Sequence, residues 1–584
     1  MVSEIGYEEA LDVTNKLLEM DEVVIYEAAI LHDGMFVRVD ILEKKGGVIN
    51  LVEVKSKSLD FTDESGFLTK KGTVQKKWEP YLVDIAFQAH VARLSFSGYT
   101  IVPHVMMPNK NNVATVDGLN QKFKLSRVGG RVKATVNGDV GLDSLGEKLL
   151  VTVPVIKCVT DILSGESFID SIKSFKIAAN DDVLLVSPVT HECLKCQYNA
   201  GAKSGMVECF NRAGMGDFDF VKAPVTKLWN YRGKGSLWGK GVFHMEGIIE
   251  SDIYKVDAND VGLVRERMVE TITCNEDRQW LQVVKTNAAD DEPFIDIDGL
   301  RAELSKHVYP LHFIDFETSR VAIPFTAGRK PYEQVAFQFS HHVMYEDGSV
   351  KHAGEYFHTV RGGFPNYDFI RALKAELDKD GGTIFKYATH ENTVLNDIKR
   401  QLEADGGVSD RVELVQFIDT ITNDKSSGRV GERDMVDMCD LVKRFYYHRL
   451  MGGSNSIKVV LPAVLNTSEY IKEKYSKPVY GRGCEIDSLN YDSGMVWVNV
   501  GDDGSVINPY KLLQGAFDGV DGDFTGEDEI NNGGAAMTAY AQMQFSEMSD
   551  EEFLLMRAAL LRYCELDTLA MVMIYEYWKD VVNE

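Results

Sequence analysis

The sequence predicts a protein of mixed α and β structure (α/β or α+β) with more than one domain. Three observations lead to this prediction. The chain has 584 residues, which is more than a single hydrophobic core usually supports. Short β-rich runs separated by turn signals occur twice, over 23–54 and over 311–359. Stretches with apolar residues at helical spacing accompany both regions.

Composition indicates a soluble, cytoplasmic protein. Hydrophobic residues make up 44% and charged residues 26% of the chain, which is typical of globular proteins. No apolar run reaches membrane-spanning length and the N-terminus is acidic, so we expect no membrane partner and no signal peptide. The net charge of -26 opposes nonspecific attraction to nucleic acid, although carboxylates that bind cations would account for part of it.

The first acidic set lies in an expected three-stranded meander. One amphipathic helix and three β-rich runs are expected at 7–18, 23–31, 35–42 and 48–54. The runs carry Glu27, Asp40 and Glu53 in that order. Lys55 shares a face with Glu53, because the two are two residues apart. Such carboxylates can bind a metal, while the lysine stabilises developing negative charge or orients the attacking water.

A helix expected over 80–94 carries the polar residue Gln88 on a largely apolar element. The order of these polar residues resembles the PD-(D/E)XK nuclease core in its RecB and Cas4-like form: Glu27, Asp40, Glu53, Lys55 and Gln88. The resemblance implies a restriction-endonuclease-like mixed sheet flanked by helices, which cuts DNA with magnesium held by Asp40 and Glu53. Lys55 would assist the reaction, and Glu27 and Gln88 would support the metal or the strands.

Lysines are frequent in and after the third expected strand, and they could attract a nucleic-acid strand: Lys55, Lys57, Lys70, Lys71, Lys76 and Lys77. Trp78 follows them, and we expect its ring to stack on an unpaired base. An ordinary solvated face is the alternative interpretation of these lysines.

Cysteines cluster in HECLKCQYNAGAKSGMVECF. Cys193 and Cys196 are spaced to share an ion, and Cys209 and His191 would complete a zinc site, or an iron–sulfur site if another thiolate joins. Relatives in the RecB and Cas4-like group often bind a 4Fe-4S cluster through one cysteine before the core and three after it. No cysteine precedes Cys158 here, so either an upstream ligand is missing, Cys158 substitutes, or the cluster is degenerate. Three reduced, unliganded thiols are the remaining alternative.

The stretch LHFIDFET, residues 311–318, carries the second acidic set. Strand alternation places Asp315 and Glu317 on one face and turns Phe316 into the core. Two converging carboxylates at the end of a buried strand are costly unless a cation lies between them, and oxygen ligands suit Mg²⁺ or Mn²⁺. A solvated acidic loop is the alternative.

The following elements have the order of a ribonuclease-H-like fold, with three antiparallel strands and then alternating helices and strands. We expect strands over 335–345, 351–359, 383–387 and 414–420, and helices over 367–377, 391–402 and 551–578. In this order the next acidic ligand should begin the helix after the fourth strand, where Glu391 stands. Asp397 lies about one and a half turns further on and points elsewhere.

In the last helix Tyr563 and Asp567 are four residues apart and share a face. Together with the earlier acids they resemble the DEDD superfamily of 3'-5' exonucleases, in the variant whose tyrosine orients the water: Asp315, Glu317, Glu391, Tyr563 and Asp567. The resemblance implies two metal ions held by the four carboxylates. Glu391 stands where this superfamily usually has aspartate.

Longer segments resemble the bacterial family DUF2779: FIDFETSRVAIP, PYEQVAFQFSHH, YYHRLMGGSNSIKVVLPAV and YCELDTLAMV. VIYEAAI and LVEVKSKS fit its N-terminal half. The family is described as nuclease-like. We expect a PD-(D/E)XK domain with the cysteine cluster over 1–215, a connector with a helix at 260–269 over 216–305, and the DEDD-type domain over 306–584.

The leading hypothesis is a metal-dependent nuclease with two sites, which acts on DNA or RNA at a single-stranded end. The alternative is a nucleic-acid-binding or assembly subunit whose sites have lost their chemistry. The glutamate at 391, the absent upstream cysteine and the acidic net charge favour that alternative. A structural protein with acidic pairs on its surface is the third possibility.

Overall fold

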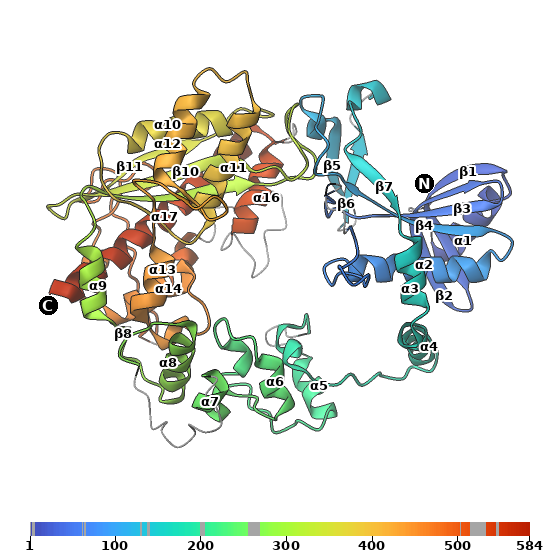
Figure 1. The fold of residues 1–584 in the computed structure, drawn as a ribbon, viewed down its shortest axis with the longest axis horizontal. Coiled ribbons are helices and arrows are strands. Elements are labelled where there is room, and N and C mark those ends of the chain that lie inside the picture. Colours follow the sequence, from blue (N-terminus) through green and yellow to red (C-terminus); the bar gives the residue numbers. More distant parts are fainter. Residues whose placement is uncertain are drawn as a thin grey trace. The chain divides into compact units, whose positions relative to one another are not determined.

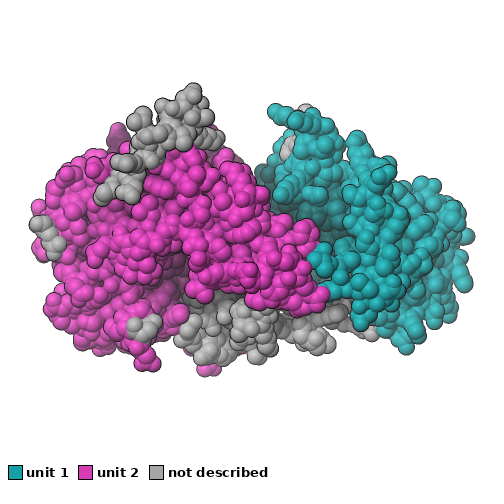
Figure 2. Space-filling model, turned by 90° about the horizontal axis from the view of Figure 1, so that it is seen from below, with its two compact units in different colours: residues 1–186, 320–333 teal, residues 187–319, 334–584 magenta. Residues whose placement is uncertain are grey.

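The computed structural model (Figure 1) describes residues 2, 6–60, 62, 66–128, 131–136, 140–198, 205–254, 269–502, 504–513, 533–544 and 548–583. The chain divides into two compact units, which Figure 2 colours separately: residues 1–186 with 320–333, and residues 187–319 with 334–584. Segment 320–333 follows the LHFIDFET stretch in sequence and belongs to the first unit. The helix expected over 260–269 lies, except for its last residue, outside the described residues.

The first unit contains a mixed sheet whose described strands have the order β1-β2-β3-β4-β7 (Figure 1). Strands β1 to β3 form an antiparallel meander, and β4 pairs parallel to β3 after the intervening helix α2. The bounds are α1 Tyr7–Leu17, β1 Glu22–His32, β2 Met35–Lys45, β3 Val48–Val54, α2 Glu79–Ser95, β4 Thr100–Pro108 and β7 Leu150–Pro154. The predicted first helix, meander and Gln88 helix are confirmed.

The apolar side of α2 forms the core of this unit. Leu82, Ile85 and Ala89 are fully buried against Val39 and Leu51 of the meander. The remaining elements are the hairpin β5 Phe123–Val128 with β6 Arg131–Val136, and the helices α3 Ile156–Leu163 and α4 Glu166–Asn180.

Short helices follow at the start of the second unit. They are α5 Met206–Arg212, α6 Lys234–Gly239, α7 Glu250–Ile253, α8 Asn275–Asn287 and α9 Ile297–Leu304, with the two-residue strand β8 Phe294–Ile295. Val225, Leu228, Leu237 and Met245 form a small core with Val283 of α8.

The second unit contains a sheet whose described strands have the order β11-β10-β9-β12-β15; Figure 1 labels its strands β10 and β11. Strands β9, β10 and β11 are antiparallel neighbours, whereas β12 pairs parallel to β9 and to β15. Their bounds are β9 Leu311–Ser319, β10 Val335–Met344, β11 Val350–Phe357, β12 Ile384–Lys386 and β15 Val436–Asp437. Short pairs elsewhere involve β13 Asn423–Asp424, β14 Arg429–Val430 and β16 Tyr446–Tyr447.

Helices cover both faces of this sheet. Ile314 and Phe316 of β9 pack in one core with α10 Asn366–Leu377, α11 His390–Ala404 and α12 Arg411–Ile421. Leu311 and Phe313, which alternate with them, pack in a second core with α13 Met438–Phe445, α14 Ile457–Thr467 and the long helix α17 Asp550–Asn583. Helices α15 Glu469–Tyr475 and α16 Gly533–Met543 complete the unit. The face toward α17 is therefore the one that carries Asp315 and Glu317.

One predicted element of this unit is wrong. The strand expected over 414–420 is the helix α12. Its buried residues recur at helical spacing, at Leu414, Phe417, Ile418 and Ile421, and this period decides its structure. The other strands and helices expected in this region are confirmed, and no end differs by more than five residues. No helix in the described ranges has both the length and the apolar content needed to cross a bilayer.

Candidate active sites

Three carboxylates from two elements converge in the second unit. Asp315 and Glu317 come from β9 and Asp567 comes from α17, which packs against β9. One oxygen of each lies within 4.8 Å of an oxygen of the other two, and this is the one such group among the residues that the structure describes. Glu317 and Asp567 are buried, and Asp315 is partly accessible. The predicted pairing of the two β9 acids with Asp567 is thus present.

Glu391 is the second residue of α11, where the sequence predicted it. Its side chain is 1% exposed, and its Oε2 has no hydrogen-bond partner among the described residues. Burial raises the pKa of Glu391 to about 8, and the charges of Asp437 and Asp567 add to this. Glu391 therefore interacts electrostatically with the three clustered acids, although it lies outside their 4.8 Å group.

Burial also raises the pKa of the other acids. The pKa of Glu317 is raised to about 8 by burial and then by Asp567. The pKa of Asp315 lies well above its ordinary value because of burial and the charges of Asp567, Glu317 and Glu391. Ionised carboxylates this close repel one another in a poorly solvated site, and a divalent cation would relieve that cost. The buried oxygens, one of them unpaired, fit Mg²⁺ or Mn²⁺.

Tyr563 is buried one turn before Asp567 on α17, as predicted. Its hydroxyl oxygen accepts a hydrogen bond from the Lys458 ammonium. An ammonium group can only donate, so the proton of Tyr563 remains available for another acceptor. Burial and the charge of Asp567 hold the pKa of Tyr563 well above its ordinary range, so the hydroxyl keeps its proton at neutral pH.

Sequence reasoning missed three residues of this site. Lys458, in the first turn of α14, lowers the pKa of Glu317 and Asp567 through its charge. Tyr510 donates a hydrogen bond to Asp567, and the sulfur of Cys564 lies 3.4 Å from Oδ2 of Asp315. Cys564 directly follows Tyr563, and this position beside a predicted site residue was the available signal. Lys458 lies in the segment YYHRLMGGSNSIKVVLPAV, which resembles the DUF2779 family but does not single out this lysine, and the sequence around Tyr510 contains no signal for this site.

The first unit brings together the three residues predicted around its β3 strand. Lys55 Nζ lies 2.6 Å from Oε1 of Glu53, and the amide of Gln88 donates to Oε2 of Glu53 at 2.7 Å. Asp84, which sequence reasoning missed, accepts from Lys55 at 2.7 Å and from Gln88 at 3.3 Å. Asp84 precedes Gln88 by one helical turn on α2, and this spacing was the available signal.

Asp40 lies at the edge of this cluster, and Glu27 stands opposite Asp40 on β1. Asp40 Oδ2 accepts a hydrogen bond from the Val54 amide at 2.7 Å, and its charge raises the pKa of Glu53. Burial raises the pKa of Glu53 more than the charge of Asp40 does. The pKa reaches about 7, although hydrogen bonds from Lys55 and Gln88 lower it. Glu27 has a φ of 58° and interrupts the β1–β2 pairing opposite Asp40. Such backbone strain in a strand is characteristic of functional sites.

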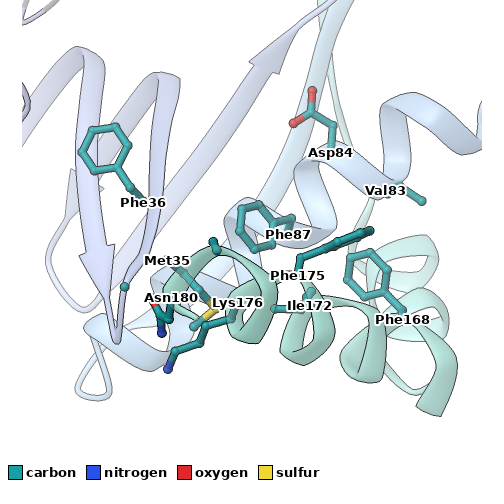
Figure 3. A pocket seen from close by; sticks show the side chains of 12 residues that line it. Met35, Phe36, Val83, Asp84, Phe87, Phe168, Ile172, Phe175, Lys176 and Asn180 are labelled. Carbon is teal, nitrogen blue, oxygen red and sulfur yellow. The ribbon is translucent and has the colours of Figure 1, made fainter. Parts of the chain in front are cut away.

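An apolar groove of about 460 Å³ lies beside this cluster, between α2, α4 and the β1–β2 turn. Figure 3 shows Phe168, Ile172 and Phe175 of α4 next to Phe87 of α2. Asp84 also lines the groove.

The predicted stacking role of Trp78 is wrong. The ring is 3% exposed and packs edge-on against Phe67 at 5.3 Å between centroids. Lys57 covers it, with Nζ 4.5 Å from the ring centroid. A base cannot reach this ring without unpacking it. The exposed lysines of the predicted patch are Lys70, Lys71, Lys76 and Lys77.

The cysteines predicted to share an ion are not brought together. In the described part of the chain, Cys193, Cys196, Cys209 and His191 do not form a group with ligand atoms within 4.8 Å of one another. Cys196 and Cys209 are exposed thiols, and the sulfur of Cys193 accepts from the Thr190 amide at 3.3 Å. Cys158 is buried in α3 of the first unit.

Comparison with known proteins gives one match. Residues 312–456 match a family model described as "Domain of unknown function (DUF2779)". The matched segment contains Asp315, Glu317 and Glu391, whereas Tyr563 and Asp567 lie beyond it. Searches of curated proteins and of solved structures found no match.

Proposed function

We propose that this chain, whose residues 312–456 match the DUF2779 family model, is a metal-dependent nuclease that hydrolyses phosphodiester bonds of DNA or RNA, acting as a 3'-5' exonuclease. The observation that carries the proposal is the convergence of Asp315, Glu317 and Asp567 within 4.8 Å, with the unpaired Oε2 of Glu391 nearby. Buried oxygen ligands in such a cluster suit the ions that nucleases use.

The sheet order supports a ribonuclease-H-like domain for this site. Three antiparallel strands stand beside two strands parallel to β9, and the first acids lie toward the end of β9. The next acid begins the helix after β12, and the last acid lies on a helix packed against β9. This order agrees with a DEDD-type arrangement.

Different side chains of the chain would bind the ions, orient the attacking water and stabilise negative charge during hydrolysis. Asp315, Glu317, Asp567 and Glu391 would hold the ions. Divalent ions, when bound, would activate water and stabilise the leaving oxygen. The proton of Tyr563, left unused by Lys458, can orient the attacking water. The Lys458 ammonium places positive charge where the phosphate becomes more negative.

An assay on labelled single-stranded DNA and RNA with Mg²⁺ or Mn²⁺ tests the proposal. We expect Asp315→Asn to lower cleavage by at least about a hundredfold, because an ion ligand is lost. Asp397→Asn is the matched control, because Asp397 pairs with Arg400 on the same unit. Equal cleavage by both variants would refute the assignment. Tight strand binding without turnover by the wild type would instead favour a nucleic-acid-binding or assembly subunit.

A second hydrolytic site, of the PD-(D/E)XK type, is proposed in the first unit. It is favoured by the contacts of Lys55 with Glu53 and Asp84 and by the parallel pairing of β3 with β4 across the α2 connection. Asp40 and Glu53 would hold its ion. Cleavage that survives Asp315→Asn should then fall on adding Lys55→Ala, but not on adding Lys45→Ala at an exposed position. Residual cleavage insensitive to Lys55→Ala would contradict the second site.

A further inference from the structure

A polar cavity of about 810 Å³ in the second unit is unused by the acidic centre. It lies where the parallel strands β12 and β15 end and the helices α11 and α13 begin, because all four elements line it. In open sheets with parallel strands, ligands bind beyond the carboxyl ends of the strands. The volume falls in the range of small-ligand pockets.

The cavity lies at the start of α11, where its lining residues Thr389 and Asn392 flank Glu391 in the sequence. Lys386 and Asp437 line it, and Lys386 Nζ lies 3.3 Å from Oδ2 of Asp437. Lys386 is 3% exposed and also donates to the Ala388 carbonyl at 2.6 Å. The charges of Lys386 and Asp437 both act on the pKa of Glu391, in opposite directions. A ligand in the cavity would therefore lie beside the candidate ion site.

Amide side chains give the wall a fixed arrangement. Asn392 of α11 donates to the Asn423 carbonyl at 3.0 Å and accepts from the Asn423 amide at 2.9 Å. Asn396 donates to the same carbonyl at 3.1 Å. These hydrogen bonds join α11 to β13 and hold the lining in place. Thr389 adds a hydroxyl group that can donate or accept, and the Thr393 hydroxyl, which donates to the Thr389 carbonyl at 2.9 Å, can accept.

The cations that line the cavity differ in their partners, since Lys386 pairs with Asp437 and Arg400 pairs with Asp397. Lys425 and Lys443 form no ion pair with another described residue, and Arg444 approaches Glu303 only at 3.8 Å. The lining also includes five acids, which equal its five cations in number and can accept hydrogen bonds from amino groups: Glu303, Asp424, Asp434, Asp437 and Asp440. A lining with both cations and carboxylates suits a nucleotide better than an inorganic anion, because lysines can contact the phosphate while amides, hydroxyls and carboxylates can contact the base edge.

We propose that this cavity binds one nucleotide unit of the nucleic-acid strand, next to the unit whose phosphodiester bond is cut. Lys425 and Lys443 contact its phosphate, and the amide wall contacts its base. The inference rests on the proposed nuclease function, because it takes the occupant from that substrate. It adds a binding site outside the carboxylate centre.

Binding of a short fluorescein-labelled single strand, measured by anisotropy at several salt concentrations in EDTA, tests this site. All variants are made in the Asp315→Asn protein, and EDTA removes divalent ions from both proposed sites, so that no cleavage occurs. The test protein carries Lys425→Ala with Lys443→Ala. The control carries Lys472→Ala in α15 with Lys477→Ala two residues after that helix, which removes the same charge away from the cavity lining.

Each phosphate contact to a single strand contributes about 0.7 to the slope of log affinity against log salt. We expect the cavity pair to reduce the slope by about 1.4 and to weaken binding several-fold at low salt, whereas the control pair leaves the slope unchanged. Thr393→Trp fills the cavity from an exposed helix position without a change of charge, so it should also weaken binding. Thermal unfolding verifies that each variant folds.

The outcomes separate this site from the proposed function. Equal slopes and affinities for the cavity and control pairs would overturn the site, even if the wild type cleaves the strand. A selective loss with the cavity pair, together with a wild type that never cleaves, would support the site and refute the nuclease. Failure of the Asp315→Asn protein to bind any strand would overturn the cavity site.

Discussion

Glu317 and Glu391 each have a pKa raised to about 8, mainly by burial. In the unfolded chain the pKa of a glutamate is about 4.3. Between these values the folded protein binds protons that the unfolded chain releases, so the free energy of unfolding falls as pH rises from about 4 to 8. Cations that replace the protons would restore stability in the upper part of this range.

The metal-free protein should therefore unfold at a lower temperature at pH 8 than at pH 5, and Mn²⁺ should stabilise it more at pH 8. Glu317→Gln should reduce both effects, because it removes one titrating carboxyl. Glu469→Gln, at an exposed acid of α15, serves as the control. Calorimetry that shows the same pH slope for both variants would contradict the assigned pKa shift.

Tyr563→Phe should slow cleavage roughly ten- to hundredfold, which corresponds to the loss of one hydrogen bond to a charged or reacting group. This substitution removes the hydroxyl of Tyr563, whose proton is left available because Lys458 only donates to its oxygen. Tyr575→Phe is a matched control on the same helix, because its hydroxyl contacts His307 rather than an acid. Steady-state kinetics at saturating Mn²⁺ would refute the role of Tyr563 if the two variants cleave equally.

At the scale of elements, α17 decides whether the centre forms. Asp567 reaches Asp315 and Glu317 only because α17 packs against β9. Leu566, the residue before Asp567, is fully buried in the core that includes Phe313. Packing around this helix thus sets the separation of the acids.

Leu566→Ala should lower the free energy of unfolding by about 2–5 kcal/mol, through lost burial and a cavity. Leu554→Ala, on the same helix but 59% exposed, should change it by less than about 0.5 kcal/mol. Urea denaturation measures both. Similar small losses for the two variants would mean that α17 is not anchored as described.

At the scale of the whole molecule, each unit has its own core and its own acidic set. Val39, Leu51 and Leu82 belong to the core of the first unit, whereas Phe313 and Phe316 belong to cores of the second. Units with separate cores can unfold in separate transitions.

Scanning calorimetry should therefore resolve the two units by their response to Mn²⁺. In the Lys55→Ala protein we expect Mn²⁺ to raise the unfolding temperature of the second unit by mass action. Asp315→Asn should abolish that shift without moving the transition of the first unit. A shift that survives Asp315→Asn would place the bound ion elsewhere.

Local sequence determined most elements and the positions of several site residues. Alternation alone put Asp315 and Glu317 on one face, and a four-residue spacing did the same for Tyr563 and Asp567, because these periods belong to the backbone. The sequence over α12 also contains the helical spacing that contradicts the strand expected there, at Leu414, Phe417, Ile418 and Ile421. The resemblance to DUF2779 was confirmed over 312–456.

Tertiary structure alone decided which of these groups meet. Lys458 and Tyr510 enter the acidic centre from distant segments, and Trp78 is removed from solvent by packing against Phe67. The spacing of Cys193 and Cys196 is compatible with a shared ion. Among the described residues, however, Cys209 and His191 do not complete a ligand group with them. Periodicity fixes the direction of a side chain on its own element, but proximity and burial depend on how elements pack, and these set the pKa shifts of the site.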